Sequence, residues 1–144
     1  MTMRLVRPED WRPSGIDDLE PAAWNALRHA GSACVVAGPG AGKTEMLAQR
    51  ADFLLRTATC RYPRRILAIS FKIDAAQNLR ARFRRRCGAD LGARLDSYTF
   101  HAFAKRLIDQ FRPVLKGANA LDPDYSIGQR RVQRHRFARL GMGK

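Results

Sequence analysis

One segment constrains this chain more than any other, because its glycines lead directly into a lysine, a threonine and a helical pattern. Residues 37–44 read AGPGAGKT, and they follow the apolar run Ala33–Val36. Glycine allows positive φ and lets a ligand approach the backbone closely, and the N-terminus of a helix attracts anions. A strand, a glycine-rich turn and a helix in this order predict a phosphate-binding loop.

Each part of this loop has an expected task. Lys43 supplies the charge for the β- and γ-phosphates of a nucleotide, and Thr44 supplies a hydroxyl for Mg²⁺, so these are the predicted catalytic residues. The usual first glycine of the motif is Ala37 here. The alternative, a glycine-rich turn with a chance lysine, is disfavoured because strand, loop and helix follow in order. The residues expected to surround the nucleotide are Gly38, Pro39, Gly40, Ala41, Gly42, Lys43, Thr44 and Glu45.

The charge of the chain is strongly unbalanced. Its 144 residues include 27 Lys and Arg against 13 Asp and Glu, a net charge of +14. Such a field favours polyanions, so nucleic acid is the expected partner and a membrane surface the alternative. No apolar run approaches transmembrane length, and no signal-peptide pattern opens the chain. The three widely spaced cysteines indicate neither a disulfide framework nor a zinc site. We therefore expect a cytoplasmic protein without a membrane partner.

Strand and helix patterns alternate along the middle of the chain. A continuous apolar run at 66–71 is typical of a strand buried in a parallel sheet. We therefore predict an α/β fold in which the strands at 33–36 and 66–70 are buried in a parallel sheet between helices, with Cys34 packed inside. The other patterns predict a strand at 95–100 and helices at 19–30, 74–86, 102–111 and directly after the phosphate loop, the last with Leu47, Ala51 and Leu55 facing inward.

Composition divides the chain into three parts. Residues 1–18 form a polar leader, in which Trp11 either packs or lacks the neighbours it would contact. Residues 19–127 carry the alternating strand and helix patterns of a domain. Residues 128–144 carry several arginines and no acid, which predicts a disordered basic tail.

Three blocks in order carry a resemblance to a known family. They read AGPGAGKT at 37–44, LAISFKIDAAQNLRARF at 67–83 and SYTFHAFAKRL at 97–107. Over residues 19–127 the chain resembles the first RecA-like domain of UvrD/Rep-type superfamily 1 DNA helicases. The resemblance implies an incomplete RecA-like P-loop NTPase domain that binds ATP and Mg²⁺. The complete enzyme would couple ATP hydrolysis to translocation on single-stranded or tailed DNA and to unwinding. It leaves the oligomeric state open.

The resemblance also implies which residues contact DNA. A base stacked on an aromatic ring gains about 1–3 kcal/mol whatever its sequence, and Phe71 would supply that ring. From the pattern alone, Phe71 is equally well interpreted as the buried end of a strand. The implied DNA-contacting residues are Ser70, Phe71, Lys72, Thr99, Phe100 and His101.

The chain departs from the family pattern in four ways. Lys72-Ile73-Asp74 stands where the family usually has Thr-Asn-Lys. The family's glutamine that hydrogen-bonds adenine would fall near Ala23, which cannot make that bond. Selectivity for adenine is therefore open, although Trp24 or Asn25 could contribute. No Asp-Glu pair follows the third block, and the second domain with its arginine fingers is absent from these 144 residues. The resemblance therefore implies a fragment that is truncated or frame-shifted near residue 127, and we expect negligible hydrolysis by this chain alone.

Two other functions are open at this point. One is a non-catalytic, basic nucleic-acid-binding fragment. The other is a different P-loop NTPase such as a nucleotide kinase, which the third block disfavours. Five arginines between residues 80 and 86 either follow DNA phosphates or lie at a solvated helix end where cations favour the dipole. They are Arg80, Arg82, Arg84, Arg85 and Arg86.

Overall fold

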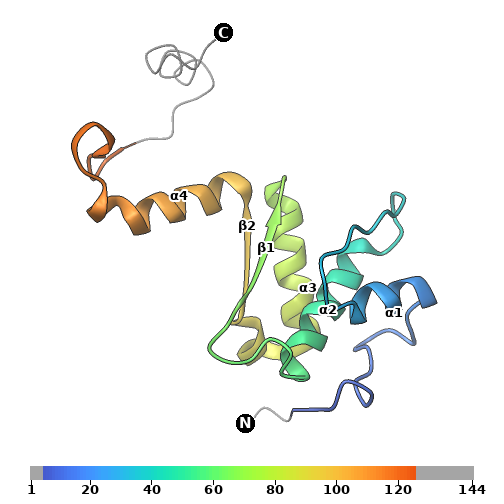
Figure 1. The fold of residues 1–144 in the computed structure, drawn as a ribbon. Helices are drawn as coiled ribbons and strands as arrows, with labels where there is room; N and C mark the ends of the chain where they lie inside the picture. Colours follow the sequence, from blue (N-terminus) through green and yellow to red (C-terminus); the bar gives the residue numbers. More distant parts are fainter. Residues whose placement is uncertain (1–4, 126–144) are drawn as a thin grey trace. The chain divides into compact units, whose positions relative to one another are not determined.

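The computed structural model describes residues 5–125, and its contacts divide the chain into two units, 1–100 and 101–144 (Figure 1). None of the helices between residues 5 and 125 combines the length and apolar character that crossing a bilayer requires. The first unit contains α1 (Pro21–Arg28), α2 (Lys43–Arg56), β1 (Ile66–Ser70), α3 (Ile73–Gly92) and β2 (Leu95–Thr99). Helix α4 (Phe100–Phe111) starts at its last residue, and η1 (Arg112–Val114) and η2 (Gly117–Asn119) follow.

The sheet of the first unit confirms the predicted parallel arrangement. β1 and β2 pair in parallel, with a register that runs from Ile66 opposite Leu95 to Ser70 opposite Thr99. Helix α3 connects them, as parallel strands require a long crossover. Both strands and the helix between them lie where the sequence patterns place them, which gives a small α/β fold.

β1 is partly buried on one of its faces and exposed on the other. Ile66 and Ala68 pack against the core, whereas Leu67 and Ile69 are 45% and 46% exposed. Successive side chains of a strand point to opposite faces, and α2 and α3 lie on the same side of the sheet in Figure 1. The prediction of a fully buried strand between helices is therefore wrong for the face of Leu67 and Ile69 within the described first unit.

The predicted strand before the phosphate loop is also wrong. Residues 32–36 have no strand structure, Val36 is 93% exposed, and Cys34 is exposed rather than packed. A strand is stable only when a neighbour pairs with its N–H and C=O groups. In the described sheet β1 and β2 pair with each other. The apolar run therefore stays outside the sheet.

The main core lies between α2, α3 and the sheet. Phe83 at its centre is fully buried, with Leu79 and Cys87 one turn away on each side along α3. The inward face of α2 includes Ala51 and Leu55 as expected, but Leu47 is 47% exposed. α3 also runs beyond the predicted end at residue 86, through a break at Gly88, whose φ of 83° favours glycine. The core residues are Ala48, Ala51, Leu55, Leu79, Phe83, Cys87, Leu91 and Leu95.

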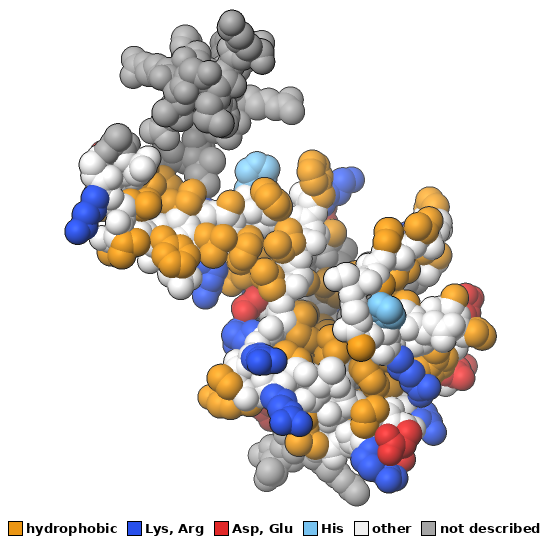
Figure 2. Space-filling view, viewed as in Figure 1, with side chains coloured by type: hydrophobic (Ala, Val, Ile, Leu, Met, Phe, Trp, Pro, Cys, Tyr) orange, Lys and Arg blue, Asp and Glu red, His pale blue; other side chains and the backbone are white. Residues whose placement is uncertain are grey.

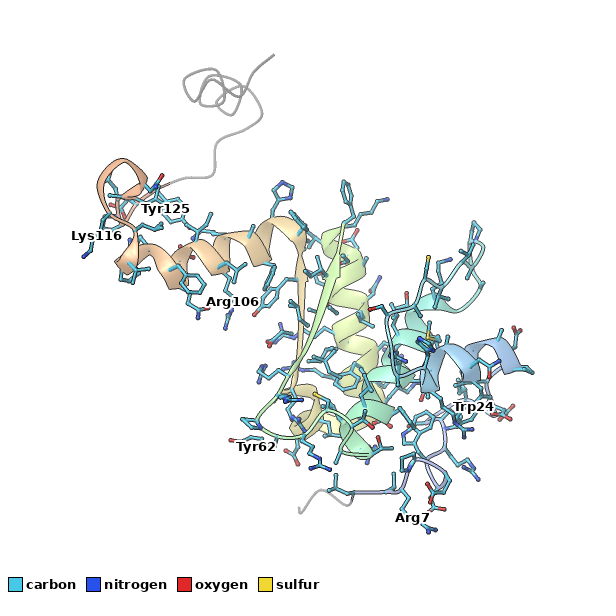
Figure 3. The ribbon with its side chains drawn as sticks, viewed as in Figure 1. Arg7, Trp24, Tyr62, Arg106, Lys116 and Tyr125 are labelled. Atoms are coloured by element: carbon cyan, nitrogen blue, oxygen red, sulfur yellow. The ribbon has the colours of Figure 1, made fainter. Side chains whose placement is uncertain are left out.

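A second core cluster includes the N-terminal segment. Trp11 is 2% exposed and makes edge contacts with Trp24 and Phe53, at ring-centroid distances of 5.7 and 5.5 Å. Its Nε1 donates a hydrogen bond of 2.8 Å to Asp52, which is itself 1% exposed and accepts a second bond from Arg56. Figure 3 shows Trp24 beside this segment. Trp11 therefore packs within the first unit rather than lacking the neighbours it would contact.

The described part of the second unit is built around α4. The Tyr125 hydroxyl donates a 2.6 Å hydrogen bond to Asp109, and the Lys105 ammonium donates one of 2.7 Å to the other oxygen of the same carboxylate. These contacts bring the segment after η2 back to the helix (Figure 3). Hydrophobic side chains form a row along α4 (Figure 2). Leu107 and Phe111 of this helix are both exposed. The predicted basic tail at 128–144 lies outside the described residues.

Candidate nucleotide and DNA site

The phosphate loop has the backbone conformation that its glycines were expected to permit. Gly40 and Gly42 have φ values of 76° and 69°, and Gly42 caps α2 at its N-terminus. Side-chain-bearing residues rarely adopt such angles. Ala41 donates to the carbonyl of Gly38 at 3.3 Å, and Gly42 donates to that of Gly40 at 2.8 Å. The loop is therefore a tight turn that ends at the first turn of a helix.

Lys43 is the first residue of α2, and its side chain folds back over the loop. Its ammonium donates a 2.9 Å hydrogen bond to the carbonyl oxygen of Ala37 and a second bond to that of Gly38. The ammonium is exposed, so a phosphate can reach it from solvent. The N–H groups of the first helical turn have no intrahelical acceptor by geometry and point the same way. Charge and donors are thus combined at one end of α2.

Thr44 and Ser70 line the same groove. It lies between α2 and β1, has a volume of about 380 Å³, and is mostly apolar, with Leu47, Leu54 and Leu79 among its walls. Thr44 enters it from the start of α2, and Ser70 enters it from the end of β1. The structure therefore places the expected magnesium-binding hydroxyl and the first expected DNA-contacting residue on one continuous surface.

Glu45 makes its side-chain contacts away from the phosphate loop. Its carboxylate, 14% exposed, accepts hydrogen bonds from Arg82 at 2.8 Å and from Arg86 at 3.1 and 3.3 Å. Burial alone raises the pKa of Glu45, but hydrogen bonds from Arg86, Arg82 and Gln49 outweigh it and lower the pKa below its ordinary value. The group of Glu45 that is left to face a phosphate is its backbone N–H.

Arg50 has a structural function that the sequence did not reveal. Its guanidinium donates hydrogen bonds of 2.7, 2.7 and 3.0 Å to the carbonyls of Ala26, Leu27 and His29, at the C-terminus of α1. The last carbonyls of a helix lack intrahelical partners and favour cations. Arg50 therefore fixes α1 against α2, the helix that carries the phosphate loop. A lone arginine within a helical pattern gave no signal of this contact.

The carboxyl edge of the sheet brings together most of the expected DNA-contacting residues. Ser70 and Thr99 are opposite each other in the register, and Phe71 and Phe100 follow them directly. Phe71 is 95% exposed and Phe100 is 63% exposed. Phe71 is therefore not the buried end of a strand, and both rings offer free faces to solvent.

The remaining residues of this set lie next to the same edge in sequence. Lys72 is exposed and caps α3, and its carbonyl accepts a 3.3 Å hydrogen bond from the Ser70 hydroxyl. The Ser70 hydroxyl lies 3.5 Å from the carbonyl oxygen of Tyr98 as well. His101 is exposed and is the first residue of the second unit. The first unit thus brings together five of the six expected residues.

The arginine cluster of α3 is divided by its contacts. Arg82 and Arg86 form ion pairs with Glu45, whereas Arg80, Arg84 and Arg85 are exposed. Exposed guanidinium groups along one helix can follow a phosphate backbone, and paired ones contribute less to its attraction. The exposed Arg80, Arg84 and Arg85 fit both interpretations of this cluster, whereas the pairing of Arg82 and Arg86 with Glu45 fits neither.

Comparison with known proteins identifies relatives of one kind. The family model for the UvrD/REP helicase N-terminal domain matches residues 19–141. ATP-dependent DNA helicase UvrD1 of Mycobacterium leprae is 32% identical over 117 residues, covering 81% of this chain and 15% of that protein. UvrD2 of Mycobacterium tuberculosis is 33% identical over 132 residues, with coverages of 86% and 18%.

A third relative extends the match beyond the mycobacteria. ATP-dependent DNA helicase PcrA of Leuconostoc citreum is 36% identical over 78 residues, covering 54% of this chain and 10% of that protein. The chain thus spans less than a fifth of the length of these relatives. The family match covers the phosphate loop, the parallel sheet and the exposed aromatic edge. On this evidence the chain belongs to the UvrD/REP helicase family, in the N-terminal domain.

Proposed function

We propose that this chain is the ATP-binding portion of a UvrD-like, ATP-dependent DNA helicase. One observation carries the proposal: a phosphate loop at the start of α2 and an exposed aromatic edge of the sheet border one groove, through Thr44 and Ser70. In the complete protein, hydrolysis at the first site would drive movement along single-stranded DNA at the second.

The nucleotide site would use the loop 38–42 and the start of α2. Backbone N–H groups and the Lys43 ammonium would bind the phosphates of ATP. Thr44 fits Mg²⁺ as one oxygen ligand. Mg²⁺ commonly keeps waters and uses few protein ligands beside substrate phosphates, and residues 5–125 contain no cluster of three or more His, Cys, Asp or Glu that could hold a metal without them. When bound, the ion would neutralise charge on the phosphates.

The DNA site would use the carboxyl edge of the sheet. Phe71 and Phe100 would stack on bases, which gives affinity without sequence preference. His101, in the second unit, is proposed from its place after Phe100 in the sequence. Ser70 and Thr99 would contact the backbone or bases beside the rings of Phe71 and Phe100, and Lys72 would add charge. Their support is position and exposure at the end of paired parallel strands.

Nucleotide binding by Lys43→Ala tests the first half of this function. We expect a fluorescent ATP analogue with Mg²⁺ to bind the wild-type chain and to bind the variant about 10- to 150-fold more weakly, since a charge-assisted hydrogen bond contributes about 1.5–3 kcal/mol. Lys116→Ala is the matched control, because Lys116 is an exposed lysine outside both candidate sites. Equal affinity of wild type and Lys43→Ala would exclude the phosphate-binding role.

A second function, a basic fragment that binds nucleic acid through charge alone, is favoured by the net charge of +14 and by the exposed Arg80, Arg84 and Arg85. Such a fragment would not distinguish one flexible polyanion from another. Competition of single-stranded DNA with heparin, matched for charge, separates the two functions. We expect DNA to compete better than heparin if bases stack on the sheet edge.

A further inference from the structure

Glu45 connects the first turn of α2 to two other parts of the first unit. It follows Thr44 directly and accepts bonds from Arg82 and Arg86 of α3, as described above. Its Oε1 also accepts a 2.8 Å hydrogen bond from Gln49, one turn later in α2. A carboxylate with three donor side chains around it, at 14% exposure, has little freedom to move.

Gln49 extends these contacts to the N-terminal segment. Its side chain is fully buried and bonds both backbone groups of Ser14: Oε1 accepts from the N–H at 3.0 Å, and Nε2 donates to the C=O at 2.8 Å. The Ser14 hydroxyl donates to the carbonyl of Arg86 at 3.2 Å. Three segments therefore meet in one polar network, which comprises Ser14, Glu45, Gln49, Arg82 and Arg86.

This network is partly buried, with side-chain exposures of 14% for Glu45, 20% for Arg86 and 44% for Arg82. A buried charged network is often neutral in stability compared with apolar packing, so its value lies in the geometry that it fixes. The element that it fixes is the first turn of α2, because Glu45 lies on that turn together with Lys43 and Thr44. A helix turn moves as a rigid body over this length, so holding one side chain orients its neighbours.

We propose that Glu45 is a positioning residue for the phosphate site. Its carboxylate, held by Arg82, Arg86 and Gln49, orients Lys43 and Thr44 without touching the nucleotide. The proposal rests on the proposed nucleotide-binding function of the loop. It also assigns Arg82 and Arg86 to the nucleotide site rather than to DNA phosphates.

The first test is nucleotide binding by Glu45→Gln, which keeps the size of the side chain and removes its charge. We expect affinity for the ATP analogue with Mg²⁺ to fall about tenfold, the lower end of the effect that outer-shell partners have on a bound ion. The ratio between affinities with Mg²⁺ and with EDTA should also shrink, because Thr44 is displaced. Glu20→Gln is the matched control: Glu20 is an exposed acid whose side chain makes no capping bond at α1.

Arg82→Gln provides a milder variant in case Glu45→Gln does not fold, since Arg82 is 44% exposed. It should reduce the same Mg²⁺ ratio to a smaller extent. The double variant should lose little more than Glu45→Gln alone, because partners in one network do not add independently. An unchanged Mg²⁺ ratio in the folded single variants would overturn the proposal.

Hydrogen exchange without nucleotide separates this proposal from the proposed function. The amide of Met46 donates to Gly42 at 2.9 Å and is the first bonded amide of α2. We expect faster exchange at Met46 and Leu47 in Glu45→Gln, with unchanged exchange in β2. Faster exchange of the whole chain, or none at these two amides, would overturn positioning by Glu45. Failure of the wild-type chain to bind any nucleotide would instead refute the phosphate site, whatever the exchange result.

Discussion

Phe71 offers a direct test of the DNA site, because its removal should affect binding and not folding. Its side chain is 95% exposed, so Phe71→Ala takes almost no packed surface from the core. We expect the free energy of unfolding to change by less than about 0.5 kcal/mol, as for other surface substitutions. Phe83→Ala gives the contrast: that ring is fully buried, and its loss should cost about 3–5 kcal/mol.

Binding of single-stranded DNA, unlike stability, should be strongly weakened by Phe71→Ala. Losing one stacked base costs about 1–3 kcal/mol, which corresponds to about 5- to 150-fold weaker affinity for single-stranded DNA. The loss should persist in 1 M salt, where the Debye length falls to about 3 Å and exposed charges are screened. Contacts from Arg80, Arg84 and Arg85 should weaken steeply with salt, because each releases counterions.

Fluorescence anisotropy with a labelled oligothymidine, at low and high salt, measures the contribution of stacking and the contribution of charge separately. Ile73→Ala is the matched control, since Ile73 is a 65% exposed apolar residue two positions away that cannot stack as a ring does. A deletion of residues 128–144 measures the contribution of the basic tail. If Phe71→Ala binds as well as wild type at high salt while the deletion abolishes nearly all affinity, the sheet edge does not bind DNA and the chain acts as a polycation.

Three further outcomes are expected. Trp11→Phe should lower the free energy of unfolding by about 1–3 kcal/mol in urea denaturation, because it leaves the buried Asp52 with one donor fewer; an unchanged midpoint would contradict this. Because the pKa of Glu45 is lowered in the folded chain, its ionised form should add to the free energy of unfolding above pH 4.5, the ordinary value, and this contribution should be lost as pH falls through the lower folded pKa. The free energy of unfolding of wild type and of Glu45→Gln, followed across that pH window, measures the contribution. Curves of the two proteins that run parallel would contradict it. The purified 144-residue chain should show negligible DNA-stimulated ATP turnover, and steady turnover abolished by Lys43→Ala would show that the expected incompleteness is wrong.

The features that could be predicted from sequence are those specified by neighbouring residues. The turn at Gly40 and Gly42 needs positive φ, which glycine supplies locally, and α2 follows it at once. β1 was predictable because its apolar run is continuous. The segment 33–36 reads in the same way but forms no strand, because a strand depends on a partner that its own sequence does not contain.

The features that escaped prediction depend on residues far apart in the chain. Trp11 and Asp52 are separated by 41 positions, and Glu45 and Arg86 likewise by 41. Nothing in the spacing of either pair indicates that they meet. The arginines of α3 were visible as a charged cluster, but only the packing of α2 against α3 brings two of them to Glu45. Packing geometry, rather than local pattern, determines these contacts.

The positions at which phosphate loops usually have glycine differ here in the residues that each would accept. Within residues 5–125, Ala58 is the one non-glycine residue with positive φ, so Ala37 occupies an ordinary backbone conformation where the motif usually has glycine. Alanine is therefore admissible at that position on backbone grounds. In a saturation library of the loop, position 37 should accept small side chains, whereas positions 40 and 42 should return almost only glycine. A search pattern that insists on all the motif's glycines would consequently overlook functional variants of this loop.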